Sequence, residues 1–191
     1  FCNQKRISGT SSFNKYDTDS IIAKALSTID TENTETEIAF FGGSFTGIDR
    51  DDMLYLLETA HKYVLAGEVS SIRLSTRPDY ITDEILAILK EYGVKTIELG
   101  LQSMDDGVLK ISKRGHDSKT AESACRLIKK YDFTLIGQMM IGLPSSTLEK
   151  EVYTAKKIAS LCDGARVYPT VVLRETELCK MASKEVIADI V

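Results

Sequence analysis

Hydrophobic and polar residues follow two periods along the chain, and each period predicts one kind of element. Where apolar residues recur every three or four positions we expect helices: over 17–30, over 49–66, and after Thr82, Ser103, His116 and Ser146. Short, nearly continuous apolar runs predict strands over 37–41, 69–76, 94–101, 133–143 and 164–173. Ser103 and Ser146 are the expected caps of their helices, because a hydroxyl can accept from the first free N–H groups.

Predicted strands and helices alternate along the chain, and this order indicates the fold class. Nearly continuous apolar strands are typical of a parallel sheet that helices cover. A doubly wound sheet, a full barrel and an open partial barrel all fit the order of elements. The sequence contains no linker, low-complexity segment or near-identical repeat, so we expect a single α/β domain over residues 1–191.

Polar residues stand at or near the carboxyl ends of the predicted strands, where ligands bind in parallel α/β folds. They come from five strands: Gly42-Gly43-Ser44, Ser75-Thr76-Arg77, Gln102, Gln138 and Tyr168-Pro169-Thr170. Between two short helices, Arg114 adds a side chain suited to binding a carboxylate. We expect these groups to line one face and to contact a long ligand that crosses the mouth of the barrel.

The glycine pair in "FFGGSFTGI" suggests direct contact between the ligand and the main chain. Because glycine has no Cβ, its carbonyls can reach an ammonium and its N–H groups can reach an anion. A tight turn between strand and helix explains the pair equally well. The pair is neither a dinucleotide fingerprint, which needs three spaced glycines, nor a phosphate loop, which needs Gly-Lys-Ser/Thr.

Composition narrows the function classes. A net charge of −4 gives no broad basic surface, so any nucleic-acid contact would need a local patch. The only histidines, His61 and His116, exclude a histidine-rich metal site. The four cysteines are too widely spaced for a small disulfide scaffold, and no apolar run could span a membrane. We therefore expect a cytoplasmic protein with no membrane partner.

Several segments, taken in order, resemble a known family: FCNQ, FFGGSFTG, STRPDYI, ELGLQS, KRGH, GQMMIGLP and RVYPTVVLRET. Together they resemble the radical S-adenosylmethionine (radical SAM) enzymes, and most of all the catalytic subunit of Elongator and its bacterial relatives. The similarity runs from Phe1 to about Leu178. Oxygen-independent coproporphyrinogen oxidases share the layout, with less similar segments.

The resemblance implies a parallel-stranded (β/α)6 partial barrel with two cofactors, a [4Fe–4S] cluster and S-adenosyl-L-methionine. Three cysteines in a C-x3-C-x2-C motif would hold the cluster, and its open iron would bind the methionine amino and carboxylate groups. One electron, from a reductant such as flavodoxin or ferredoxin, would cleave S-adenosylmethionine to methionine and a 5′-deoxyadenosyl radical. The implied substrate is a tRNA wobble uridine.

The same resemblance assigns roles to individual residues. Cys2 matches the third cluster cysteine, and Gly42, Gly43 and Ser44 match a motif whose carbonyls accept from the methionine ammonium. Ser75 would face methionine or ribose, while Gln102 and Arg114 would contact the carboxylate and ribose. Gln138 stands where relatives often have an acidic ribose ligand. Adenine would be flanked by Met140, Val167 and Tyr168.

The sequence departs from the family at the cluster motif, because it begins one residue before the third cysteine. Cys125, Cys162 and Cys179 lack the close spacing that would let them replace the other two. We therefore expect the cluster loop and first strand to be missing and the chain as given to be inactive. Three hypotheses stay open: a radical SAM enzyme of tRNA, the same chemistry on another substrate such as a porphyrinogen, and a non-catalytic barrel that binds S-adenosylmethionine or RNA.

Overall fold

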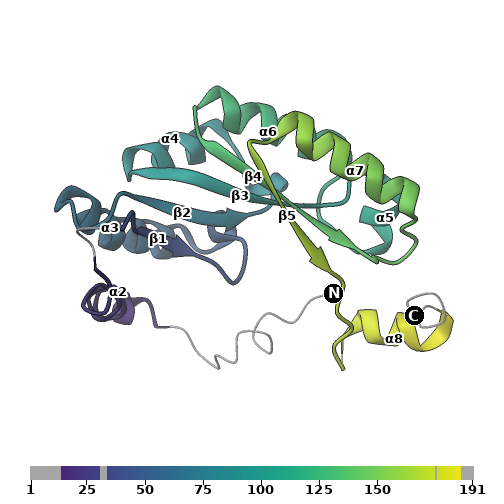
Figure 1. The fold of residues 1–191 in the computed structure, drawn as a ribbon, viewed down its shortest axis with the longest axis horizontal. Coiled ribbons are helices and arrows are strands. Elements are labelled where there is room, and N and C mark those ends of the chain that lie inside the picture. The colour runs from purple at the N-terminus through teal and green to yellow at the C-terminus, as the bar shows by residue number, and fades with distance from the viewer. Residues whose placement is uncertain (1–13, 31–33, 175, 186–191) are drawn as a thin grey trace.

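The computed structural model describes residues 14–30, 34–174 and 176–185, and its centre is one curved sheet (Figure 1). The sheet consists of β1 (Glu37–Phe40), β2 (Ser71–Thr76), β3 (Val94–Gln102), β4 (Thr134–Ile141) and β5 (Gly164–Pro169). The strands are parallel and lie side by side in chain order, with β1 and β5 at the two edges. The expected parallel α/β partial barrel is confirmed, and the described residues supply five of its strands.

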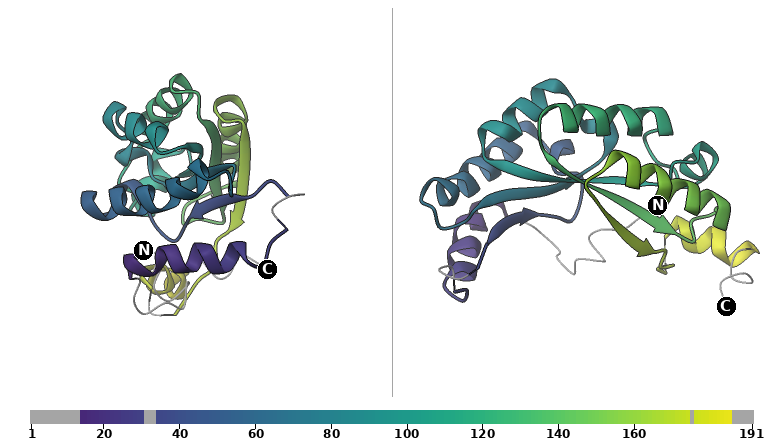
Figure 2. Two further views of the ribbon diagram at one scale, coloured as in Figure 1. Left: turned by 90° about the vertical axis from the view of Figure 1, so that its left-hand side faces the viewer. Right: turned by 45° about the horizontal axis from the view of Figure 1, so that its top comes forward.

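Four helices join consecutive strands and cover the same, convex face of the sheet (Figure 2). They are α3 (Arg50–Leu65), α4 (Asp83–Glu91), α6 (Ser118–Lys130) and α7 (Leu148–Leu161). Shorter elements complete the fold: η1 (Lys15–Asp17), α2 (Thr18–Leu26), η2 (Phe45–Gly47), η3 (Pro78–Tyr80), α5 (Asp106–Ile111) and α8 (Glu177–Glu185). Within the described residues, no helix has both the length and the hydropathy needed to cross a membrane.

Two predicted helix caps are wrong. Helix α7 is capped by Thr147, whose hydroxyl accepts from the N–H of Lys150, and not by Ser146. Helix α5 is capped by Asp105, whose carboxylate accepts from the N–H of Val108 at 2.9 Å. Ser103, the predicted cap, instead accepts from the N–H of Asp105. Neighbouring polar residues can cap equally well, so sequence alone does not choose between them.

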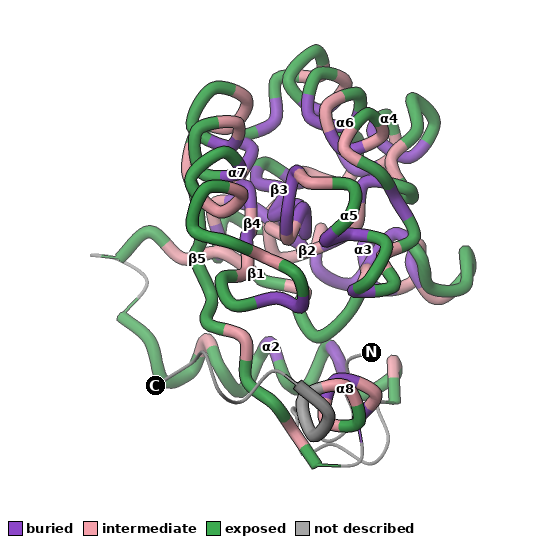
Figure 3. Tube along the Cα trace, turned by 90° about the vertical axis from the view of Figure 1, so that its right-hand side faces the viewer, coloured by how far each residue is buried: buried purple, intermediate pink, exposed green. Residues whose placement is uncertain are grey.

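The hydrophobic core lies between the sheet and its helices, where the buried residues gather in Figure 3. Leu74, Ile97, Leu99 and Leu135 are fully buried strand residues on this convex side. Because successive strand residues point to opposite faces, the residues between them face the concave side. Those concave positions include Arg73, Ser75, Glu98, Gly100, Gln138 and Met140.

Candidate functional site

The tip of β1 is an open turn. Gly42 has a φ of +105°, a backbone conformation that favours glycine. A Cβ added to Gly42 or Gly43 would meet no atom within 4 Å, and both residues are exposed. Ser44, half-buried, is the N-cap position of η2. The main chain at this tip is therefore accessible to a ligand, as the ammonium-binding interpretation requires.

A pocket of about 470 Å³ lies beside this tip, between β1 and α2. Its lining includes Ile21, Ile22 and Phe40 besides Gly42 and Gly43, and most of it is apolar. An apolar lining suits an apolar group and disfavours the charged methionine moiety of S-adenosylmethionine. The groups that suit a charged ligand lie instead on the concave side of the sheet.

Because Gly100 in β3 has no side chain, polar groups from the ends of β2 and β3 and from the following loop approach its main chain closely. A Cβ on Gly100 would lie 3.0 Å from Nε2 of Gln102, 3.4 Å from Nη2 of Arg114 and 3.4 Å from the carbonyl oxygen of Thr76. Arg114 donates from Nη2 to the Gly100 carbonyl at 3.0 Å. Gln102 has a φ of +66°, uncommon outside glycine, and its buried Oε1 accepts no hydrogen bond from the described residues. The predicted site residues Gln102 and Arg114 therefore lie close together beside the main chain of Gly100. Oε1 of Gln102 can accept a hydrogen bond from a ligand.

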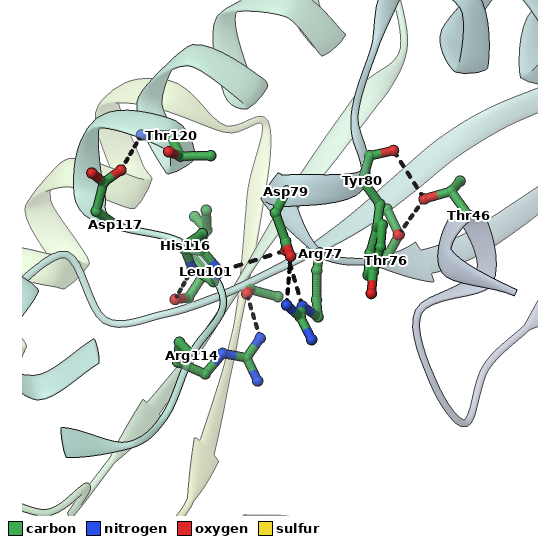
Figure 4. Close-up of polar contacts among 11 residues, drawn as sticks. Thr46, Thr76, Arg77, Asp79, Tyr80, Leu101, Arg114, His116, Asp117 and Thr120 are labelled. Carbon is green, nitrogen blue, oxygen red and sulfur yellow. Dashed lines mark hydrogen bonds and ion pairs between the residues drawn. The ribbon is translucent and has the colours of Figure 1, made fainter. Parts of the chain in front are cut away.

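The loop between α5 and α6 packs against the residues that follow β2 (Figure 4). Arg77 donates to both carboxylate oxygens of Asp79, from Nε at 3.0 Å and from Nη2 at 2.5 Å. Nδ1 of His116 lies 4.0 Å from the same carboxylate. A Cβ on Gly115 would overlap the Arg77 guanidinium, so a larger residue at this position would displace that side chain. The STRPD and KRGH segments thus form one cluster that holds the loop of Arg114.

His116 is buried in this cluster. Its Nε2 lies 3.2 Å from the carbonyl oxygen of Leu101, which can only accept, so Nε2 carries the proton. Burial, and then the positive charge of Arg114, lower the pKa of His116 below its ordinary value. At neutral pH the ring is therefore an uncharged structural donor.

A network of polar side chains crosses the concave face, with one residue from each strand: Glu37, Arg73, Glu98, Gln138 and Arg166. Glu98 is 0% exposed and lies at its centre. Sequence reasoning missed it, although a glutamate in the buried run VKTIELGLQ is a visible signal. Of this network only Gln138 was predicted as a site residue.

The remaining predicted residues are only partly brought together. Ser75 is half-buried on the concave face, paired in register with Glu98. Met140 and Tyr168 are register partners, so their side chains share the concave face. Val167 pairs with the buried Met139 and lies on the opposite face, 57% exposed. The register therefore separates Val167 from the other two residues expected to flank adenine.

Comparison with models of protein families shows which family the chain belongs to. Residues 1–158 match the model of the radical SAM superfamily. The chain belongs to the radical SAM superfamily. Members of this family of enzymes generally use a [4Fe–4S] cluster and S-adenosylmethionine, and the sequence-based resemblance is confirmed at this level.

Among curated relatives, this radical SAM chain is similar to Elongator complex protein 3 of Dictyostelium discoideum, with 26% identity over an alignment of 169 residues that covers 77% of the chain. It is also similar to the tRNA uridine(34) acetyltransferase of Methanocaldococcus infernus, with 31% identity over an alignment of 112 residues that covers 56% of the chain. The matches cover 30% and 21% of those relatives. The chain thus corresponds to less than a third of each.

Solved structures agree on the fold. Elp3 of Methanocaldococcus infernus, with an N-terminal deletion, superposes with a TM-score of 0.73 at 23% identity, over 90% of this chain and 45% of that one. Coproporphyrinogen III oxidase of Escherichia coli, a radical SAM enzyme, gives 0.61 at 18% identity, over 85% and 39%. At these identities the likeness establishes the radical SAM fold alone.

The two family cofactors fit the described residues unequally. The cradle at Gly100 and the open tip at Gly42 and Gly43 offer donors, acceptors and space that suit S-adenosylmethionine. Within the described residues, no group of three or more His, Cys, Asp and Glu side chains could hold a metal. Cys125 is buried in the core, as expected of a cysteine outside the site, and Cys2 lies outside the described residues. The described part of the chain therefore lacks a group of three side chains that could hold the cluster.

Proposed function

We propose that this radical SAM protein binds S-adenosylmethionine across the carboxyl ends of its strands and cleaves it reductively, in the modification of a tRNA uridine. The observation that carries the proposal is that the open tip of Gly42 and Gly43 and the Gln102–Arg114 pair lie at the same edge of one parallel sheet. Ligands of parallel α/β folds bind at this edge.

Each part of the ligand has a chemically matched partner. The methionine ammonium would donate to main-chain carbonyls at Gly42 and Gly43, where no side chain intervenes. Arg114 would donate to the methionine carboxylate, as a guanidinium does best. Gln138 would contact the ribose, with Ser75, Gln102 and Ser44 at its margins. Met140 and Tyr168 would flank adenine from the concave face, whereas Val167 points to the opposite face of the sheet and would take no part.

A [4Fe–4S] cluster, when bound, would supply the electron that splits S-adenosylmethionine into methionine and a 5′-deoxyadenosyl radical. Cys2 would be one of its ligands by resemblance to the family motif. A small redox protein such as flavodoxin or ferredoxin is the proposed reductant. The residues described here would bind and orient S-adenosylmethionine.

The proposed tRNA substrate is supported by the named relatives, Elongator complex protein 3 and a tRNA uridine(34) acetyltransferase. With a net charge of −4, the chain would contact RNA through a local patch or through other parts of the protein.

The test is anaerobic reconstitution of the protein from its native gene with iron and sulfide, followed by dithionite and S-adenosylmethionine. We expect a cluster spectrum and release of 5′-deoxyadenosine, stimulated by tRNA and not by coproporphyrinogen. Arg114→Gln should lower the release, whereas the control Arg126→Gln, at an arginine whose side chain is 72% exposed on α6, should not. Cluster-loaded protein that releases no 5′-deoxyadenosine would refute the proposed activity.

A further inference from the structure

Glu98 lies at the centre of the network that crosses the concave face. Its carboxylate accepts from Nη2 of Arg166 at 2.9 Å, and Nε of Arg166 lies 2.8 Å away. Nε of Arg73 lies 3.6 Å from the same carboxylate, and Arg73 in turn is 3.4 Å from Glu37. A fully buried glutamate between two guanidinium groups carries a negative charge. Consistent with this charge, the hydrogen bond to Glu98 raises the pKa of Arg166.

This charge fixes the orientation of a neighbouring amide. One amide atom of Gln138 lies 2.8 Å from Oε2 of Glu98. An ionised carboxylate can only accept hydrogen bonds, so the amide atom that faces it must be the donor, Nε2. The other amide atom of Gln138, Oε1, is therefore turned away from Glu98.

We propose that Glu98 is a positioning residue, which holds the Gln138 amide so that its oxygen is presented to the ligand as a hydrogen-bond acceptor. The site then selects a ligand group that donates, such as a ribose hydroxyl, and disfavours an acceptor such as a phosphate or carbonyl oxygen at this position. This inference rests on the proposed S-adenosylmethionine site and assigns Glu98 a role in its specificity.

The orientation itself is measurable without any ligand. In ¹⁵N-glutamine-labelled chain, the Gln138 side-chain NH₂ signal is assigned by its loss in Gln138→Ala. We expect slowed proton exchange for this group in the wild type and faster exchange in Glu98→Gln, because an amide at position 98 can face Gln138 with either its oxygen or its nitrogen. Glu37→Gln is the matched control, since Glu37 belongs to the same network but does not touch Gln138. Equal exchange in the wild type and Glu98→Gln would overturn the proposal.

The ligand preference is measured with S-adenosylhomocysteine and its 2′,3′-dideoxyribose analogue, by calorimetry on the same variants. One well-formed hydrogen bond predicts that the wild type prefers the ribose ligand about tenfold. Glu98→Gln should lower this preference to about twofold, whereas Glu37→Gln should keep it. A wild type without preference, or a Glu98→Gln variant that retains it, would overturn the proposal.

A double substitution distinguishes the positioning role of Glu98 from a general loss of packing. Glu98→Gln combined with Gln138→Glu keeps the net charge and returns an acceptor to position 138, held by the amide of position 98. We expect this variant to recover the ribose preference, which loss of packing alone would not allow, and failure to recover it counts against the proposal. If neither ligand binds the wild type, the S-adenosylmethionine site fails, while the exchange measurement still decides the orientation of Gln138.

Discussion

The tips of β1 and β3 lie at the same edge of the sheet, yet they are built in opposite ways. At β1, a Cβ added to Gly43 would meet nothing within 4 Å. Beside β3, a Cβ on Gly115 would overlap the Arg77 guanidinium and lie 2.9 Å from Oδ2 of Asp79. The first glycine stands in open space, and the second stands where two side chains already touch the main chain.

This difference teaches that glycine has two separate functions around one site. Gly42 and Gly43 keep the main chain accessible. Their conformational freedom makes the unbound tip less ordered, and the gain, direct contact with the main chain, appears only when a ligand binds. Gly115 lets the Arg77–Asp79 pair lie against the loop of Arg114, which orders that loop before a ligand arrives. Preorganised charged side chains lose less entropy on binding.

The largest expected effect comes from filling the packed position. Gly115→Ala should lower the free energy of unfolding by about 1.5 kcal/mol, because the Arg77 guanidinium must shift and its pair with Asp79 is disturbed. Urea denaturation measures the loss. Gly43→Ala is the matched control and should change the free energy of unfolding by less than about 0.5 kcal/mol. Equal losses in the two variants would erase the distinction between the tips.

Gly43→Ala, which should hardly change stability, should have a clear effect on ligand binding. Gly43→Ala should weaken binding of S-adenosylhomocysteine about tenfold, because its methyl group occupies the space that the ligand needs. Calorimetry with the folded variant gives the dissociation constant. If Gly43→Ala binds as tightly as the wild type, the openness of this tip has no role in binding.

A smaller effect is expected from weakening the pair that orders the loop. Asp79→Asn should cost about 1 kcal/mol of stability, because a partly buried bidentate pair loses its charge. The exposed pair of Arg50 and Glu84, with side chains 43% and 73% exposed, provides the control Glu84→Gln. We expect that control to stay within about 0.5 kcal/mol in thermal denaturation. Equal losses would show that Arg77 and Asp79 act as an ordinary surface pair.

The last prediction concerns the pH dependence of the stability of this cluster. The pKa of His116 lies below its ordinary value in the folded protein, so below about pH 6.5 the unfolded chain binds the extra proton. Stability should therefore fall as pH drops from about 7.5 to about 5.5, by at most about 1.4 kcal/mol in total, because the unfolded chain takes up this proton only near pH 6.5. The charged groups that face the ring are Arg77, Asp79 and Arg114. His116→Gln should flatten the melting temperature over this range, and an unchanged slope would contradict the assignment.

The sequence predicts one side of this comparison better than the other. Apolar runs and helical spacing are local signals, so they predict the five strands and the helices between them. The open tip is equally visible, because Gly42 and Gly43 follow closely on a strand. Their accessibility depends on few neighbours, and a short segment of sequence is enough to suggest it.

The packed side depends on residues far apart in the chain, and local patterns do not reveal it. In the sequence, Gly115 looks like an ordinary loop residue between two helices, yet the side chain that a larger residue there would displace is Arg77 on another loop. Glu98 finds its partners Gln138 and Arg166 diagonally across two further strands, which requires the register. The face on which Val167 lies also follows from the register and not from its apolar character.

The most direct measurement is a crystal structure of the chain with S-adenosylhomocysteine. The account predicts the amino group within hydrogen-bond distance of a carbonyl at Gly42 or Gly43, the carboxylate at Arg114 and a ribose hydroxyl at Oε1 of Gln138. A ligand held only by the apolar side chains of the pocket between β1 and α2, with its carboxylate and ribose away from Arg114 and Gln138, would contradict it.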